Sequence, residues 1–190
     1  GATEFLAGWT GIGTGCLEPL VYELLATRQI ARIALIGTAG RFAHSRRELA
    51  RVHLCDPATC RYTGLDRWVG DSLLRPKLPP HAAATELPRA AIVSTDLYYG
   101  FSQQALHPSF PLYNVTLEQI YREGTADMDF VDMEVGQFYY LCDKLGGDRL
   151  EAYFACKGAA NEMGEGQQQL DNSIATIESC VEAALRLLVE

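Results

Sequence analysis

Two acidic side chains stand directly before an apolar run in the segment FVDMEVGQFYYLC, residues 130–142. Burying a charged side chain costs free energy unless a partner compensates the charge. Asp132 and Glu134 therefore need either a structural partner, such as the first backbone N–H groups of the following helix, or a ligand. For Asp132, a role as helix cap and a direct contact with a ligand are two alternatives of about equal weight.

Three other segments bring polar or very small residues to predicted strand ends. They are GTAG at 37–40, STDLYYG at 94–100 and KGAANE at 157–162. In open α/β sheets, ligands bind at the carboxyl ends of the strands. We therefore expect these three segments and the start of the helix after Glu134 to form one site.

Hydrophobic periodicity predicts alternating strands and helices. We expect strands over residues 3–11, 30–37, 90–96 and 150–158. We expect helices over residues 16–29, 114–124 and 133–145, and a long C-terminal helix. A strand–helix–strand order implies a right-handed crossover and a parallel strand pair. The sequence therefore predicts a single α/β domain over residues 1–190, with three α/β/α layers around a mostly parallel, mixed central sheet.

Two regions carry further local predictions. The segments 48–55 and 60–69 are predicted to form a pair of strands. The C-terminal helix is expected to face the core with an apolar stripe at helical spacing. Its members are Ile174, Ile177, Val181, Ala184, Leu185 and Leu188.

The composition limits the classes of partner. The chain has 190 residues, of which 48% are hydrophobic and 21% are charged, and its net charge is −8. An acidic chain repels nucleic acid and anionic membranes, and no apolar run reaches the roughly 18 residues of a membrane span. The six cysteines form no regular disulfide framework and no secretory signal is visible, so we expect a cytoplasmic protein.

One histidine and two cysteines lie close together in VHLCDPATC, residues 52–60. His53, Cys55 and Cys60 supply at most three ligands, whereas a structural zinc site usually has four ligands in two pairs. We therefore expect no metal and no cofactor, and interpret these thiols as parts of a strand and a turn.

Four segments, in this order, resemble the nucleoside phosphorylase and nucleosidase superfamily. They are TGIGTG at 10–15, IGTAGRF at 36–42, IVSTDLYY at 92–99 and VDMEVGQFYYLC at 131–142. The nearer likeness is to the nucleosidases that cleave methylthioadenosine and S-adenosylhomocysteine. The resemblance runs from about residue 5 to the C-terminus, with a divergent middle at 43–88. It implies that the chain opens at the family's second strand. Either the protein lacks the first strand, whose acidic residue helps to activate the attacking water, or a preceding piece was removed or left out.

The resemblance implies a role for each matched segment. Glu134 matches the glutamate that accepts charge-assisted hydrogen bonds from the 2′ and 3′ hydroxyls of the ribose. Met133 matches a methionine that packs under the sugar, and Asp132 stands where the family more often has a glutamate. The other matched residues edge the sugar and base, hold the nucleophile or stack on the base: Thr38, Ala39, Gly40, Tyr98 and Tyr99.

The leaving group marks a departure from the family pattern. A departing purine gains a proton at N7, and a general acid contributes roughly 10²–10⁴-fold. Adenine-cleaving nucleosidases use an aspartate, whereas the matching residue here is Asn161. Asparagine cannot act as a general acid but offers a donor and an acceptor to a base edge, and phosphorylases that prefer 6-oxopurines carry an asparagine in a similar place. Glu162 is the alternative acid if the loop register shifts by one residue.

The nucleophile marks a second departure. Many phosphorylases of the superfamily bind phosphate with an arginine at the position of Leu35. Phosphate needs charge-assisted donors and water does not, so this position favours a hydrolase. Arg41 keeps phosphate open as an alternative; its other interpretation is a solvated surface charge.

These observations predict an N-ribosyl hydrolase that cleaves a purine nucleoside or a nucleoside-like metabolite. The alternatives are a purine nucleoside phosphorylase and a catalytically weak nucleoside-binding relative. The expected partners are a small-molecule nucleoside and further copies of the chain, since relatives form dimers or higher oligomers. Trp9, Tyr139 and Tyr140 belong either to such an interface or to the core.

Overall fold

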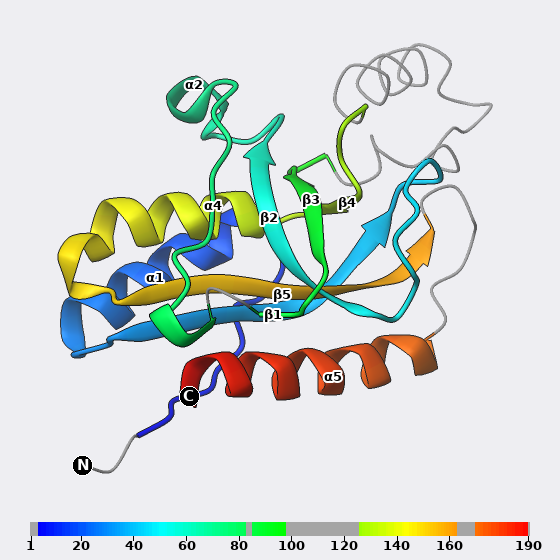
Figure 1. The fold of residues 1–190 in the computed structure, drawn as a ribbon. Helices are drawn as coiled ribbons and strands as arrows, with labels where there is room; N and C mark the ends of the chain where they lie inside the picture. Colours follow the sequence, from blue (N-terminus) through cyan, green and yellow to red (C-terminus); the bar gives the residue numbers. More distant parts are fainter. Residues whose placement is uncertain (1–3, 83–84, 98–125, 163–169, 190) are drawn as a thin grey trace.

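Five strands form one central sheet in the computed structural model, which describes residues 4–82, 85–97, 126–162 and 170–189. The strands are β1 (Arg32–Arg41), β2 (Val52–Cys60), β3 (Arg89–Ser94), β4 (Phe130–Asp132) and β5 (Ala152–Glu162). The pairs β1–β5, β2–β3 and β3–β4 are parallel, and the pairs β1–β4 and β2–β5 are antiparallel. The strands close into a barrel in the order β1-β4-β3-β2-β5 (Figure 1). The predicted α/β class with a mixed central sheet is confirmed. The predicted arrangement in three α/β/α layers stays a prediction.

Helices flank the sheet on two sides (Figure 1). The helix α1 (Thr14–Thr27) packs on α4 (Val135–Leu141), which continues into a π-helical turn, η4 (Cys142–Gly146), and a 3₁₀ turn, η5 (Gly147–Arg149). On the other side, α5 (Leu170–Val189) lies against β1 and β5. Two short elements, α2 (Asp66–Val69) and η1 (Pro80–Ala82), lie between β2 and β3. In the described part of the chain, no helix combines the length and the apolar character needed to cross a membrane.

The main core lies between the sheet and the pair formed by α1 and α4. Leu17 and Val21 of α1 and Phe138 and Tyr139 of α4 are all at most 2% exposed. Burying each such apolar side chain contributes about 1.5–3 kcal/mol relative to exposure. The Tyr139 hydroxyl donates to the carbonyl of Cys55 at 2.6 Å and accepts from the backbone N–H of Ala155 at 3.0 Å. Tyr139 therefore belongs to the core, not to an interface.

Three sequence-based element predictions are wrong. Residues 4–13 contain no strand, and the predicted strand pair 48–55 and 60–69 is instead the single strand β2 followed by the short helix α2. GTAG does not end its strand, because β1 runs through it to Arg41. The reason is a partner strand: Gly37 to Ala39 pair in parallel register with residues 157–159 of β5, whose backbone supplies the hydrogen bonds.

The helix α5 is rotated relative to the predicted apolar stripe. Ile174 is 56% exposed and Leu185 is 42% exposed, although both were expected to face the core. The buried positions are Thr176, Cys180, Ala184 and Leu187, of which only Ala184 belongs to the predicted stripe. Gly158 of β5 explains the rotation, since a Cβ there would lie 2.2 Å from Cγ2 of Thr176. The glycine lets α5 approach β5 closely at Thr176, so the face of the helix that carries Thr176 packs on the barrel.

Candidate functional site

A buried lysine joins the two acids of the DMEV segment. The Lys157 ammonium lies 3.2 Å from Oδ2 of Asp132 and 3.2 Å from Oε2 of Glu134. The side chains of Lys157, Asp132 and Glu134 are 4%, 2% and 13% exposed. Burial disfavours the charged ammonium, but the two carboxylates outweigh it, so the pKa of Lys157 is raised. The cluster thus holds one positive and two negative groups out of water.

Both carboxylate oxygens of Asp132 have protein partners. Its Oδ1 accepts from the Ser94 hydroxyl at 2.5 Å, and its Oδ2 accepts from the backbone N–H of Val135, the first residue of α4, at 3.0 Å. Burial raises the pKa of Asp132, and the positive charge of Lys157 opposes that rise. The bond to Val135 is a cap-type bond, one of the two roles left open for this residue. Its ligand contact stays a prediction.

Glu134 is fixed from two distant parts of the chain. Its Oε1 accepts from the backbone N–H of Gly13 at 2.9 Å, while Oε2 faces Lys157. Gly13 has φ +91°, a left-handed conformation that side-chain-bearing residues rarely adopt. A Cβ on Gly13 would lie 3.8 Å from the Cε of the half-buried Met133. The TGIGTG segment therefore lies against the DMEV segment, a contact that the sequence did not predict.

GTAG also contacts this cluster. A Cβ on Gly37 would lie 3.3 Å from the Lys157 ammonium nitrogen, so the absence of a side chain leaves room for the lysine. The next three residues continue β1, with Thr38 half-buried and Ala39 and Gly40 buried. Small residues at these places keep the backbone open to close approach.

Asn161 and Glu162 end β5 beside the end of β1. Gly40 pairs in register with Asn161, and Arg41 pairs with Glu162. The Arg41 guanidinium forms an ion pair with the Glu162 carboxylate and donates to the carbonyl of Arg47 at 2.8 Å. The Oδ1 atom of Asn161 is buried and has no hydrogen-bond partner among the described residues. Arg41 is therefore not a free surface charge, and Asn161 presents an unused acceptor.

Leu35, Tyr98 and Tyr99 complete the predicted set. Leu35 is 6% exposed and packs in the main core. Tyr98 and Tyr99 lie outside the described residues. The structure thus brings Asp132 and Glu134 into one cluster with GTAG. Asn161 lies on β5, where it pairs with Gly40 of the same GTAG segment on β1.

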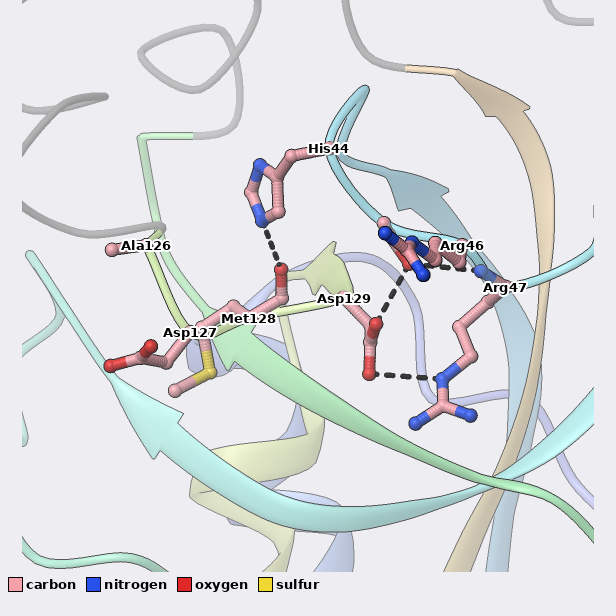
Figure 2. A pocket seen from close by; sticks show the side chains of 8 residues that line it. His44, Arg46, Arg47, Ala126, Asp127, Met128 and Asp129 are labelled. Atoms are coloured by element: carbon pink, nitrogen blue, oxygen red, sulfur yellow. Dashed lines mark hydrogen bonds and ion pairs between the residues drawn. The ribbon is translucent and has the colours of Figure 1, made fainter.

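A separate pocket opens beyond the end of β1 (Figure 2). It has a volume of about 420 Å³ and is lined by residues 44–47 and 126–129. Asp129 holds it together, accepting from the Ser45 hydroxyl at 2.8 Å and from Nε of Arg47 at 3.2 Å, while Nε2 of His44 lies 2.8 Å from the carbonyl of Met128. None of the predicted site residues lines this pocket.

The candidate metal ligands do not form a ligand set. His53, Cys55 and Cys60 are all buried on β2, and the described residues contain no group of three His, Cys, Asp or Glu side chains arranged to hold a metal ion. Nδ1 of His53 lies 2.9 Å from the carbonyl of Arg51, and its ring meets Phe130 edge-on with centroids 5.1 Å apart. Burial raises the pKa of both thiols, so they behave as small apolar groups.

Solved structures identify the fold. No protein-family model matches the chain, and no curated protein matches its sequence. The apo 5′-methylthioadenosine nucleosidase of Arabidopsis thaliana superposes with a TM-score of 0.68 at 15% identity, over 93% of this chain and 68% of that chain. The 5′-methylthioadenosine/S-adenosylhomocysteine nucleosidase of Helicobacter pylori gives 0.68 at 11% identity, over 95% and 77%.

A second activity occurs among the similar structures. The futalosine hydrolase of the same bacterium gives a TM-score of 0.62 at 13% identity, over 95% of this chain and 76% of that chain. This chain has the fold of the nucleoside phosphorylase and nucleosidase superfamily. The resemblance predicted from four short segments is confirmed at the level of the fold.

Lys157 is the residue that sequence reasoning missed in this nucleosidase fold. Its signal was present: it is the only charged residue between Ala152 and Asn161, in an otherwise apolar or small-residue strand. A lysine in a buried strand requires an anionic partner. Asp132 and Glu134 of the DMEV segment, on another element, in turn require a cationic partner, so the lysine and the acids could have been paired from the sequence.

Proposed function

We propose that this protein is an N-ribosyl hydrolase that cleaves the N-glycosidic bond of a purine nucleoside or a nucleoside-like metabolite. One observation carries the proposal. Among the described residues, each carboxylate oxygen of Glu134 has one hydrogen-bond partner, Gly13 for Oε1 and Lys157 for Oε2. A carboxylate oxygen has two acceptor sites, so one acceptor on each oxygen is left for the 2′ and 3′ hydroxyls of a ribose. A vicinal diol fits a carboxylate that is fixed in this way.

The charge of the cluster suits the reaction. Cleavage of the glycosidic bond passes through an oxocarbenium-like sugar that carries developing positive charge. Asp132, Glu134 and Lys157 together carry a net charge of about −1 when all three are ionised. A preorganised negative site with little water strengthens the attraction for such a charge. Met133 supplies the apolar surface proposed to lie under the sugar.

Water is the proposed nucleophile. A phosphate would need positively charged donors, but Leu35 is in the core, and the terminal nitrogens of Arg41 are engaged by Glu162 and the carbonyl of Arg47. Only the buried Nε of Arg41 has no partner among the described residues, and one donor is a weak basis for a phosphate site. Thr38, Ala39 and Gly40 are proposed to edge the sugar and hold the water. The hydrolases among the similar structures are consistent with this choice.

Base release is proposed to use Asn161. Its buried Oδ1, which has no partner among the described residues, can accept a hydrogen bond from a base edge. Tyr98 is proposed to stack on the base, and Tyr99 to contact the base or the ribose edge. Glu162 is the weaker candidate for proton donation, because Arg41 engages its carboxylate. Asparagine also favours the second candidate function, a phosphorylase acting on 6-oxopurine nucleosides.

We further propose one domain over residues 1–190, a cytoplasmic location and a homodimer or higher oligomer. All six cysteines are free, which suits a reducing compartment. Trp9 is 92% exposed and is the proposed interface residue.

The test measures release of free base from adenosine, inosine, methylthioadenosine and futalosine, with and without phosphate. Base release without phosphate is the expected result. Strict dependence on phosphate would replace the hydrolase with the phosphorylase. Thermal stabilisation by a nucleoside without any base release would leave only a binding protein.

A further inference from the structure

We propose that Lys157 is a positioning residue that balances the charge of the Glu134 carboxylate and aims it at the ribose, with Asp132 as the anchor of the lysine. This inference rests on the proposed function of Glu134. The ammonium lies 3.2 Å from both carboxylates, and all three side chains are buried or nearly so. An ammonium has three donors, so two can serve the acids while the lysine stays in place.

The lysine links elements that are far apart in the chain. Ser94 at the end of β3 holds Asp132, Lys157 on β5 joins Asp132 to Glu134, and Gly13 before α1 holds the other oxygen of Glu134. The bare Gly37 on β1 leaves the room that the ammonium occupies. Such a chain of hydrogen bonds fixes the orientation of Glu134 before a ligand arrives, which is the condition for preorganised recognition.

Charge balance gives the lysine a second effect. Two carboxylates that share a buried site cannot both ionise easily without a cation, and one of them takes up a proton. Beyond the triad, the titratable groups that face it from the packed elements are His53, Cys55, Cys60 and Cys180.

None of these neighbours supplies a replacement positive charge at neutral pH. Burial lowers the pKa of His53, which favours the neutral ring. Burial raises the pKa of Cys60 to about 12 and that of Cys180 to about 11, so both thiols stay neutral, as does Cys55, whose pKa is also raised by burial. Among the described residues that face the acids, Lys157 is the cation that balances them.

Removing the lysine therefore makes ribose binding depend on pH. In Lys157→Met the unbranched apolar stem stays, but Asp132 and Glu134 share a proton at low pH. We expect the pair to hold this proton to a higher pH than in the wild type, where the positive charge of Lys157 opposes protonation of Asp132. The acids of the variant are freed of the proton only as the pH rises, so we expect its nucleoside affinity to grow more steeply with pH than that of the wild type.

The experiment combines two readouts on the folded, full-length chain. Carbon-13 NMR of the Asp and Glu side-chain carboxyls follows their titration without ligand. Calorimetry at pH 6 and pH 8.5 measures binding of a C-nucleoside analogue of a purine nucleoside, whose carbon–carbon glycosidic bond the protein cannot hydrolyse. In Lys157→Met we expect affinity at the lower pH to fall at least about tenfold, with partial recovery at the higher pH. Lys144→Met, at an exposed lysine, is the matched control for loss of one charge and leaves both readouts unchanged.

A charge-balancing second substitution separates positioning from a merely structural role. Lys157→Met with Asp132→Asn removes one charge of each sign and keeps an oxygen for the backbone N–H of Val135. We expect this pair to restore a pH profile as shallow as that of the wild type, although with weaker binding. If Lys157→Met alone does not fold, the double variant and Lys157→Arg, which is expected to keep the wild-type profile, carry the test.

The variant Glu134→Gln distinguishes failure of this inference from failure of the proposed function. Equal affinity and an equal pH profile in Lys157→Met and the wild type, with binding lost in Glu134→Gln, would overturn the inference alone. Wild-type-like nucleoside binding in Glu134→Gln, or no binding to the wild type, would overturn the proposed function. In that case a carboxyl titration that is unchanged in Lys157→Met would overturn the charge-balancing role as well.

Discussion

The Lys157 ammonium lies 3.2 Å from the Glu134 carboxylate, although the two residues stand 23 positions apart on β5 and at the start of α4. This pair explains how an acid can stand before a buried helix. The cost of burying Glu134 is offset by one cation and one backbone N–H, from Gly13, which together leave acceptor sites unused. The same arrangement stabilises the fold and prepares a ligand site.

Glu134→Gln tests the ribose assignment directly. The amide oxygen of the variant can still accept from Gly13, but the amide nitrogen cannot accept from a hydroxyl or from Lys157. We expect kcat/KM for the cleaved nucleoside to fall at least about tenfold, since one charge-assisted hydrogen bond to a ribose hydroxyl, worth about 1.5–3 kcal/mol, is lost and the remaining acceptor is neutral. Thermal unfolding monitored by circular dichroism should show a folded protein. A variant that turns over like the wild type would remove Glu134 from the site.

Gly37→Ala probes the space around the ammonium. The new Cβ would lie 3.3 Å from Nζ of Lys157, so the lysine must shift by a few tenths of an ångström. We expect the free energy of unfolding to fall by about 1 kcal/mol. We also expect kcat/KM to fall roughly tenfold, because a displaced Lys157 ammonium no longer holds the Glu134 carboxylate in its orientation. Gly15→Ala is the control, since no atom lies within 4 Å of its added Cβ. Equal kinetics for the two variants would separate Gly37 from catalysis.

The sequence reveals the acids and the glycines of the site but not the contacts between them. Glu134 stands out because an acid beside an apolar helix needs a partner, and Gly13 and Gly37 stand out as parts of glycine-rich segments. Their meeting depends on the register of β1 with β5 and on the path before α1, which are long-range features. Local pattern also failed for β1, because a partner strand supplied hydrogen bonds to a glycine-rich segment that alone resembles a turn.

Asn161→Asp tests the alignment of the leaving-group residue. An aspartic acid at this position can protonate the departing base, and general acids contribute roughly 10²–10⁴-fold where they are well placed. We expect adenosine hydrolysis to rise at least about tenfold, measured as adenine release at pH 6, with a smaller change for inosine. The structural reason is the buried Oδ1 without a partner among the described residues. A drop for both nucleosides would show that Asn161 does not face the base.

Gly158→Ala tests the contact that sets the rotation of α5. The added Cβ would lie 2.2 Å from Cγ2 of Thr176, so the helix or the strand must move. Overpacking of this kind costs about 1–3 kcal/mol, which denaturant unfolding would detect as a lower midpoint. Thr176→Ser removes the clashing methyl and keeps the hydroxyl, so the double variant should regain much of the loss. Two losses that simply add would mean that the two residues are not coupled.

His53 is expected to make stability depend on pH. Burial lowers its pKa in the folded protein below the ordinary value of 6.5, so the unfolded chain binds a proton more readily. The stabilisation from keeping His53 neutral is fully present above pH 6.5 and is lost as the pH falls toward the folded-state pKa. His53→Asn keeps a donor for the carbonyl of Arg51 but cannot titrate. We expect the free energy of unfolding of the wild type to fall between about pH 7 and pH 5 more steeply than that of the variant, as measured by urea titration at each pH. Parallel profiles would assign the acid sensitivity to other groups.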